Sequence, residues 1–356
     1  MKKRYVGLGL ALTMTALLTA CGSKAGETTA AATTAASAAA ETAAGKETEK
    51  ETEASADKVL NFKLAENQPE GNPITDGMYM FAELAKEYSN GTVNIEVYPN
   101  AALCDEASSI DQCSAGTLDF SRVNSNTLAP VVDIFGAFGM PYLFTDTDHK
   151  YRALDGDAGM MAFDALDSAN LVGLDYFEAG ARSFYTTSKQ INGVADLKGM
   201  KVRVQPTEVA ISMVQSLGAE ATPMEYGEVF QGLQTGIVDG AENDFVSYYT
   251  SGHYEVAKNF TIDEHMMPPA LLICSKKAWD SMSPAQQEAV KKASHDAAVW
   301  QRQAMQDFQE ESRKLCEEAG CTMIDVDKAE FQAASAPVYD QYPQYQEIVG
   351  LVKNVQ

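Results

Sequence analysis

The segment Lys198–Phe245 constrains the fold of this chain most strongly, because strand and helix patterns alternate along its length. Residues Lys201–Gln205 alternate polar and apolar side chains, as a strand does, and Pro206 ends that run. The next predicted elements are a helix over Val209–Leu217, a strand at Ala219–Met224, a helix at Tyr226–Gln234 and a strand at Ile237–Ala241. Such alternation predicts an α/β fold with a parallel, doubly wound sheet.

Two polar side chains fall where such a sheet binds ligands, beyond the carboxyl ends of its strands. Arg203 lies late in one predicted strand, and Asn243 follows another. A guanidinium group at a strand end can hold a carboxylate through two parallel, charge-assisted hydrogen bonds. The spacing alone leaves a second interpretation open, in which Arg203 forms an ordinary surface or interlobe salt bridge.

Several short motifs occur in an order typical of one protein family. They are Lys198-Gly-Met-Lys-Val-Arg-Val204, Leu217-Gly-Ala219, Pro223-Met224, Gly227-Glu-Val229 and Leu233-Gln-Thr-Gly-Ile-Val-Asp-Gly-Ala-Glu-Asn243. With them, the chain after residue 58 resembles the DctP family, the solute-binding proteins of TRAP (tripartite ATP-independent periplasmic) transporters. The resemblance implies a two-lobe periplasmic-binding-protein-like fold with a long helix that spans both lobes. It also implies that Arg203 clamps the carboxylate of a small organic acid, which is then delivered to small and large integral membrane subunits.

The first 57 residues are predicted to be a targeting signal and a linker. Basic residues Lys2-Lys-Arg4 precede the apolar run Tyr5–Leu18, which is the pattern of a secretory signal. The following Leu18-Thr-Ala-Cys21 is similar to the lipobox of bacterial lipoproteins, which predicts lipidated Cys21 as the only membrane anchor. An ordinary cleaved signal with an incidental cysteine is the alternative. Gly22–Asp57 lacks aromatic and large aliphatic residues, so a disordered tether is expected.

The remaining part, Lys58–Gln356, is too long for one ordinary core, so two lobes are expected. We expect residues 58–180 mostly in lobe I, residues 181–269 mostly in lobe II, and residues 270–356 in a C-terminal segment that packs on both. The net charge of −23 argues against nucleic acid and anionic lipid as partners. An extracytoplasmic monomer is expected, in which a few local arginines attract an anionic ligand.

In lobe I, the loop after the first strand is polar, and its residues Glu66, Asn67 and Asn72 are expected to face the cleft. The resembled family often has His where this chain has Asn72. The predicted elements of lobe I are the strand Lys58–Ala65, a helix from a cap at Thr75 or Asp76 to Tyr88, the strand Thr92–Tyr98, the helix Ala107–Ala115 and the strand Leu118–Val123.

Arg122 and Asn124 fall at the end of the last of these strands. Arg122 is a second candidate for an arginine in the cleft, and a structural salt bridge is the alternative. Asn124 is a candidate for binding a ligand hydroxyl, although asparagine outside helices more often caps a turn.

A second group of candidates centres on Arg182, within Val172–Thr187, which is predicted to carry a strand from lobe I into lobe II. The resemblance places Arg182 near the ligand or in a network behind it, together with Glu242 and His265. A carboxylate between two cations orients both of them. We therefore expect Glu242 and His265 to support the site from behind the ligand.

The chemistry of the ligand is predicted from the polar set as a whole. Tyr226-Gly-Glu and Ser247–Lys258 resemble the sugar-acid branch of the family. A uronate needs one carboxylate clamp and several partners for its hydroxyls, whereas a C4-dicarboxylate needs two cationic clamps. The candidate ligand-binding residues fit the needs of a uronate better than those of a C4-dicarboxylate. We therefore predict a hexuronate such as glucuronate or galacturonate, with a C4-dicarboxylate or keto acid as the alternative. The candidates are Arg203, Asn243, Arg182, Arg122, Glu66, Asn67, Asn72, Asn124 and Asp244.

A long helix is predicted near the C-terminus. Ser283 is suited to cap it, Pro284 to its first turn and Gln286 to completing a capping box. The helix is predicted to reach about Ala319 and to end at Gly320. The tail Phe331–Gln356 is predicted to be further helix, interrupted by its two prolines.

Neither a cofactor nor a metal is predicted, because the cysteines and the 4 histidines lack the spacing of metal ligands and no nucleotide or nucleophile motif occurs. The odd number of cysteines after Cys21 leaves at least one thiol free. Cys316 and Cys321 straddle a helix end and are better placed for a disulfide than Cys104 and Cys113.

The favoured function is therefore that of a binding protein, and not an enzyme, that closes two lobes around an organic acid. Two other classes stay open. One is an exported lyase or hydrolase of sugar acids with Glu242 and His265 as base and acid. The other is a sensory binding partner of a receptor.

Overall fold

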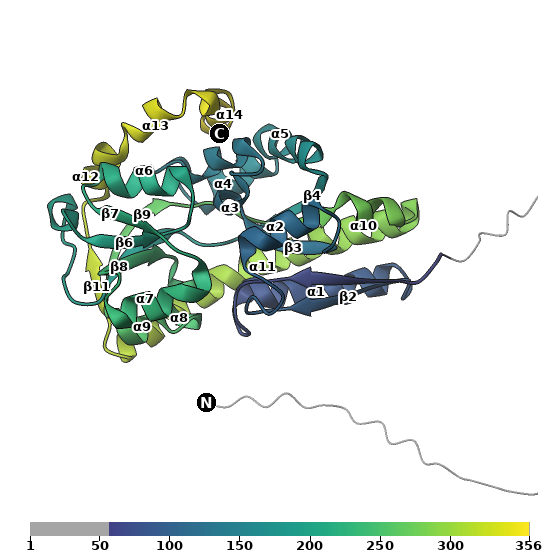
Figure 1. The fold of residues 1–356 in the computed structure, drawn as a ribbon, viewed down its shortest axis with the longest axis horizontal. Helices are drawn as coiled ribbons and strands as arrows, with labels where there is room; N and C mark the ends of the chain where they lie inside the picture. The colour runs from purple at the N-terminus through teal and green to yellow at the C-terminus, as the bar shows by residue number, and fades with distance from the viewer. Residues whose placement is uncertain (1–56, 356) are drawn as a thin grey trace, which may run out of the picture. The chain divides into compact units, whose positions relative to one another are not determined.

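The computed structural model describes residues 57–355 and builds them on two β-sheets with helices packed against both (Figure 1). The predicted signal peptide, the lipidation site Cys21 and nearly all of the predicted tether Gly22–Asp57 lie outside the described residues, so they stay predictions from the sequence. In the described part of the chain, no helix is both long enough and apolar enough to span a membrane.

The first sheet, which we call lobe I together with its helices, has the strand order β2-β1-β3-β10-β4. Its strands are β1 Leu60–Ala65, β2 Val93–Tyr98, β3 Phe120–Asn124, β4 Leu171–Phe177 and β10 Ala270–Ser275. The helices between them are α1 Pro73–Tyr88, α2 Glu106–Ser114, α3 Ser125–Leu128, η1 Asp133–Gly139, α4 Thr147–Leu154, α5 Asp157–Ala165 and η2 Leu166–Ala169, and α10 Lys276–Ser281 follows β10.

The second sheet, which we call lobe II together with its helices, has the order β11-β9-β5-β8-β6-β7. Its strands are β5 Arg182–Thr186, β6 Lys201–Val204, β7 Glu220–Pro223, β8 Gly240–Asn243, β9 Asn259–Met266 and β11 Thr322–Asp325. Its helices are η3 Val194–Leu197, α6 Glu208–Ser216, η4 Tyr226–Glu228, α7 Val229–Thr235, α8 Phe245–Thr250 and α9 His253–Val256. The predicted alternation of strands and helices between Lys198 and Phe245 is therefore confirmed.

Both sheets are mixed. The strands predicted within Lys198–Phe245, β6, β7 and β8, pair in parallel as expected, and each sheet also contains strands that run the other way. Strand β10 is antiparallel to β3 and β4 in lobe I, and β5 is antiparallel to β8 and β9 in lobe II. The cause is the path of the chain, which passes from β4 of lobe I to β5 of lobe II and returns from β9 to β10. A strand that enters a sheet from the side of the other lobe must run against its neighbours.

The first of these connections lies within Val172–Thr187, the segment predicted to carry a strand from lobe I into lobe II. Strand β4 ends at Phe177 and β5 begins at Arg182, so residues 178–181 form a short link between the sheets. The side chain of Gln301 holds this link, because its amide nitrogen donates to the Glu178 carbonyl (2.9 Å) and its oxygen accepts from the Glu178 N–H (2.8 Å). Gly180 within the link has φ +75°, a conformation that favours glycine.

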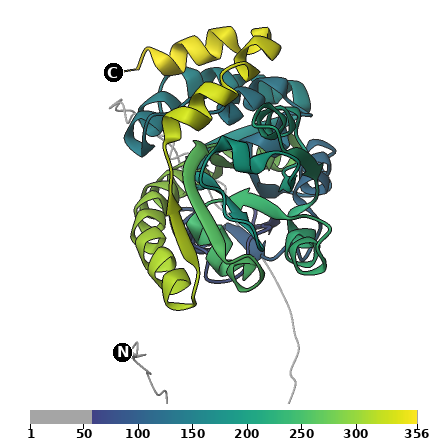
Figure 2. The same ribbon diagram turned by 90° about the vertical axis from the view of Figure 1, so that its left-hand side faces the viewer.

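The predicted long helix is α11, Pro284–Glu318, and both halves of the predicted capping box at Ser283 and Gln286 are formed. Its 35 residues give a length of about 52 Å. It packs on α1 and β4 of lobe I and on α8 of lobe II, so it spans both lobes as expected. The C-terminal helices lie on the opposite side of the molecule (Figures 1 and 2) and are α12 Lys328–Ser335, α13 Val338–Gln341, η5 Pro343–Tyr345 and α14 Gln346–Lys353.

Local details differ from the expectations in two places that matter for the cleft. The cap of α1 is Asn72, whose side chain accepts from the Ile74 N–H (2.9 Å), and not Thr75 or Asp76. Asparagine caps strongly, and proline suits the first helical position that follows it. Strand β8 begins at Gly240 and includes Asn243, because residues 237 and 238 instead turn back onto the Gly232 carbonyl.

The packing of α6 shows why this stretch folds as the sequence predicts. Its residues Val209, Ala210, Met213 and Val214 lie on one face and are buried. Burying an aliphatic side chain of this size contributes about 1.5–3 kcal/mol. The same face fixes α6 beside the strand that carries Arg203.

All five cysteines within the described residues are thiols. Cys316 and Cys321, the better-placed pair from the sequence, are adjacent at the end of α11, where the Cys321 N–H donates to the Cys316 carbonyl (3.0 Å). The Tyr248 hydroxyl donates to the Cys321 sulfur (3.3 Å). Residues 57–355 contain no group of three side chains arranged to hold a metal ion.

Candidate functional site

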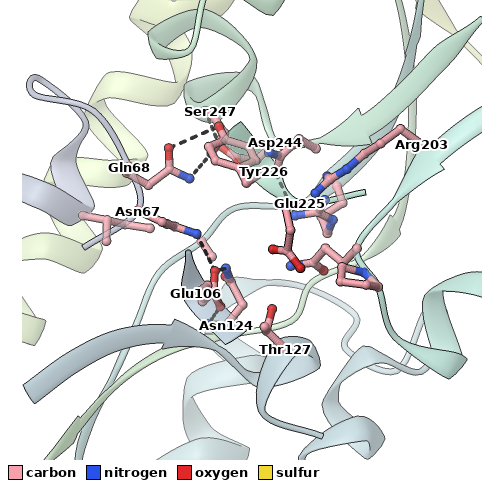
Figure 3. A pocket seen from close by; sticks show the side chains of 16 residues that line it. Asn67, Gln68, Glu106, Asn124, Thr127, Arg203, Glu225, Tyr226, Asp244 and Ser247 are labelled. Atoms are coloured by element: carbon pink, nitrogen blue, oxygen red, sulfur yellow. Dashed lines mark hydrogen bonds between the residues drawn. The ribbon is translucent and has the colours of Figure 1, made fainter. Parts of the chain in front are cut away.

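A polar pocket lies between the two lobes, and side chains from both lobes line it. Lobe I contributes Asn67, Gln68, Glu106, Asn124 and Thr127. Lobe II contributes Arg182, Arg203, Gln205, Glu225, Tyr226, Asn243, Asp244 and Ser247. Figure 3 shows Arg203 on one side, Glu106 and Asn124 on the other, and Glu225 between them.

The structure brings six of the predicted ligand-binding residues to this pocket, namely Asn67, Asn124, Arg182, Arg203, Asn243 and Asp244. It places the other three, Glu66, Asn72 and Arg122, behind the lining, which corrects the expectation that they face the ligand. The predicted supporting residues Glu242 and His265 are fully buried and also lie outside the lining.

Arg122 and Glu66 are withdrawn from the pocket because they neutralise each other. Arg122 Nε donates to Glu66 Oε2 (2.8 Å), and its Nη2 donates to Glu66 Oε1 and to the Asn67 side-chain oxygen. Neither side chain is exposed. The alternative interpretation of Arg122, a structural salt bridge, is the one that the structure adopts.

Asn72 is withdrawn for a different reason, since it joins the two lobes. Its oxygen caps α1, and its amide nitrogen donates to the Gln68 side-chain oxygen and to Thr250 Oγ1 in lobe II (both 3.2 Å). Gln68 also bridges the lobes, because its nitrogen donates to Ser247 Oγ and its oxygen accepts from the Tyr226 hydroxyl (both 3.2 Å). The lobes are therefore closed over the pocket by side-chain hydrogen bonds.

Glu106 is the main residue of the lobe I wall that sequence reasoning missed. It is the first residue of α2, and its carboxylate accepts hydrogen bonds from the Asn124 N–H and from the side-chain amides of Asn67 and Asn124. The helix start at the carboxyl end of the edge strand β2 was the available signal, because ligands gather at such ends. Gln68, Thr127, Glu225 and Ser247 were missed as well.

In lobe II, Arg182, Glu242 and His265 form the network that the resemblance implied. Arg182 Nη2 donates to Glu242 Oε1 (2.9 Å), and its Nη1 donates to the Asn243 side-chain oxygen (2.7 Å). His265 Nε2 lies 3.7 Å from Glu242 Oε2, an ion-pair distance that is too long for a hydrogen bond. Asp263, which the sequence analysis did not single out, accepts from the other ring nitrogen of His265 (2.7 Å).

The charges of this network stabilise one another. Burial lowers the pKa of His265, but the carboxylates of Asp263 and Glu242 reverse that effect and raise it to about 9. Burial raises the pKa of Glu242, and Arg182 and His265 more than offset it, to about 2. Around neutral pH the network therefore contains a carboxylate, a guanidinium and an imidazolium.

Arg203 differs from both other arginines. It is 2% exposed and lies near the end of β6, where its Nε and Nη2 donate to one carbonyl oxygen, that of Met224 (3.0 and 2.8 Å). In the described part of the chain, no carboxylate forms an ion pair with it. Burial accordingly lowers the pKa of Arg203. The result is a desolvated cation in the pocket lining with donors still available.

Comparisons with known proteins show the family to which this chain belongs. The family model of DctP, the bacterial extracellular solute-binding proteins of family 7, matches residues 64–345. A solute-binding protein of Chromohalobacter salexigens is 38% identical over 290 residues, which cover 81% of this chain and 86% of that protein.

Two solved structures of TRAP periplasmic solute-binding proteins extend the match to the fold. The protein from Xanthobacter autotrophicus Py2, with bound β-D-galacturonate, has a TM-score of 0.80 and 40% identity, and the match covers 83% of this chain and 100% of that one. The protein from Roseobacter denitrificans, with bound β-D-glucuronate, has a TM-score of 0.81 and 33% identity over 83% and 100%.

The chain therefore belongs to the DctP family of extracellular solute-binding proteins, the binding components of TRAP transporters. Proteins of this family work outside the cytoplasm, together with membrane permease subunits. The predicted family and two-lobe α/β fold are confirmed.

Proposed function

We propose that this protein captures a hexuronate such as glucuronate or galacturonate and delivers it to the membrane subunits of a TRAP transporter. The observation that carries the proposal is Arg203, a buried cation in the pocket lining without a carboxylate partner in residues 57–355. The ligand carboxylate supplies the missing anion. It accepts two parallel hydrogen bonds from the guanidinium edge that Met224 leaves available.

The rest of the lining supports a polyhydroxy acid. Glu106, Glu225 and Asp244 offer carboxylate oxygens, and Asn67 and Asn124 offer amides, which are suitable partners for sugar hydroxyls. Arg182 is the other cation in the lining, and Glu242 already neutralises it. This arrangement suits one carboxylate and several hydroxyls better than the alternative ligands, a C4-dicarboxylate or a keto acid.

Binding is coupled to closure of the lobes. The pocket lining comes from both lobes, so a ligand that contacts both favours the closed state. Four hydrogen bonds between side chains of the two lobes add to this preference, from Gln68 to Ser247, from Tyr226 to Gln68, from Asn72 to Thr250 and from Asn126 to Gln205. The link at residues 178–181 is one of the segments at which the lobes move apart.

The protein releases its ligand unchanged and is not an enzyme. Glu242 and His265, the base and acid of the rival hypothesis, lie behind Arg182 and outside the pocket lining. A general acid or base must lie within hydrogen-bond reach of the group that it protonates or deprotonates, and neither side chain belongs to the pocket lining. We further propose, from the sequence, that a monomer is held at the outer side of the cell membrane by lipidated Cys21.

A thermal-shift screen of the purified protein tests the proposal against glucuronate, galacturonate, succinate, a keto acid and neutral sugars. A ligand that binds only the folded state raises the melting temperature by mass action. A rise with the hexuronates alone is expected. A rise with succinate or the keto acid instead would contradict the ligand class, and recovery of a changed product after incubation would contradict the binding role.

A further inference from the structure

The pocket lining contains more carboxylates than is usual for a site that binds an anionic ligand. Glu106, Glu225 and Asp244 all belong to its lining. Within residues 57–355, none of the three forms an ion pair with a lysine or arginine. Only Arg203 is a cation there without a carboxylate partner. The pocket is therefore electrostatically asymmetric, with one site for an anion and acidic walls around the remainder.

The three carboxylates differ in the hydrogen bonds that they accept from the protein. Glu106 accepts hydrogen bonds from Asn67 and Asn124, and Asp244 caps α8 by accepting from the Ser247 N–H (3.0 Å). Glu225 has no hydrogen-bond partner for its side chain among the described residues. It is half-buried, and Figure 3 shows its side chain between Arg203 and the lobe I wall. Glu225 is thus the carboxylate most available to a bound molecule.

The charges near Glu225 are mostly of its own sign. Burial raises the pKa of Glu225, and Asp105 and Glu106 in lobe I raise it further, against the opposing effect of Arg203. An additional negative charge placed there meets the same repulsion. A hydroxyl at that position instead donates a hydrogen bond to a carboxylate that lacks one.

We infer that Glu225 restricts the pocket to acids with a single carboxylate and rejects sugar diacids. This inference rests on the proposed function and adds the residue that sets the charge of the ligand. When Arg203 holds the first carboxylate, the distal end of the ligand faces Glu225 and Glu106. A second carboxylate at that end of the ligand lies beside these negative charges, and the repulsion weakens its binding. Binding sites select against competing ligands in this way.

The test uses three acids with the same galacto configuration and isothermal titration calorimetry. Galacturonate tests the proposed function, galactonate is an open-chain acid with one carboxylate, and galactarate is the open-chain acid with two. The variant is Glu225→Gln, which keeps shape and a hydrogen-bond acceptor but removes the charge. Glu228→Gln is the matched control, because Glu228 is exposed only three residues further along the chain, at the end of η4, and lies outside the pocket lining.

For the unaltered protein, galactarate is expected to bind at least about 100-fold more weakly than galacturonate. In Glu225→Gln, the ratio of the galacturonate and galactarate affinities is expected to fall by about tenfold or more, and galactarate should gain relative to galactonate as well. Glu228→Gln should keep the original ratios.

Each contrary outcome has its own meaning. Equal affinity of the unaltered protein for galacturonate and galactarate overturns the inference but leaves the proposed function standing. The same holds if Glu225→Gln leaves galactarate as weak as before relative to both other acids, because the charge of Glu225 then does not set the selectivity. If the unaltered protein binds none of the three acids, the titrations are repeated with glucuronate, gluconate and glucarate, and the same ratios are compared. If it binds none of these either, the proposed function itself fails.

Discussion

The two walls of the pocket use buried arginines in opposite ways. Arg122 in lobe I and Arg203 in lobe II are 1% and 2% exposed, and both lie near the carboxyl ends of parallel strands. Arg122 is neutralised by Glu66, whereas the Met224 carbonyl is the only hydrogen-bond acceptor for Arg203 among the described residues. Burial and strand position therefore do not identify a ligand clamp. The proposal of Arg203 as the clamp is supported by the fact that no protein carboxylate pairs with it among the described residues.

Arg182 combines features of Arg122 and Arg203. Glu242 neutralises it, as Glu66 neutralises Arg122, yet it also lines the pocket and holds Asn243 through a hydrogen bond. We regard it as a residue that fixes the position of the lobe II wall. The comparison of the three arginines leads to four predictions.

Arg203→Ala should have the largest effect on binding and little effect on folding. Loss of the charged partner of a buried carboxylate should raise the Kd for a hexuronate about 1000-fold. Because the arginine has no anion in the free protein, its removal leaves no charge uncompensated, and the melting temperature should change little. Titration calorimetry and thermal unfolding measure the two effects. Arg203→Lys keeps the charge but loses the planar guanidinium fork, so its Kd should lie between those of the unaltered protein and Arg203→Ala. Normal binding by Arg203→Ala would contradict the proposed clamp.

Arg122→Ala should show the reverse pattern. It leaves the carboxylate of Glu66 buried without a cation, so the free energy of unfolding should fall by about 3–5 kcal/mol. Denaturant unfolding of the ligand-free protein measures this. The double variant Arg122→Met/Glu66→Gln removes both charges and should recover much of the loss. A single variant as stable as the original would show that the pair contributes nothing to folding.

His265 should make stability depend on pH above neutrality. Its pKa is raised in the folded state to about 9, so the protonated form favours folding. This contribution is complete below the ordinary histidine pKa of about 6.5 and is lost as pH rises through 9. The expected loss between these values is about 2–3 kcal/mol. His265→Gln should flatten the profile of unfolding free energy against pH, and an equal slope in both proteins would assign the dependence to other groups.

The sequence predicts the lobe II wall better than the lobe I wall, for a physical reason. Arg203 and Asn243 follow from strand ends within one local strand and helix pattern. Arg122 pairs with Glu66, 56 residues away, and no local pattern reveals that partner. The antiparallel strands β5 and β10 escaped prediction likewise, because their direction depends on how the chain crosses between lobes.

The residues that bridge the lobes were hardest to foresee. Gln68 and Ser247 meet across 179 positions of sequence, and Glu225 reaches the pocket from the residue just before a short 3₁₀ helix, without a hydrogen-bond partner for its side chain among the described residues. Local propensity sets neither position. Only the closed arrangement of the two walls gives these side chains a role.

The smallest predicted effect comes from a hydrogen bond between the two lobes, which forms only when the lobes are closed. Thr250 Oγ1 accepts a hydrogen bond from Asn72 across the lobes, and Thr250 lies outside the pocket lining. Thr250→Val keeps the shape but removes the acceptor, which costs about 0.5–1.5 kcal/mol in the closed state alone. Dissociation of the hexuronate in stopped-flow measurements should therefore quicken about 2- to 10-fold, with little change in association. Thr235→Val is the matched control, because Thr235 is exposed and its hydroxyl, like that of Thr250, donates to the carbonyl four residues earlier in its own helix, but it accepts no hydrogen bond among the described residues. If both variants release ligand equally fast, the interlobe hydrogen bond does not hold the lobes closed, and the two walls are joined through the ligand instead.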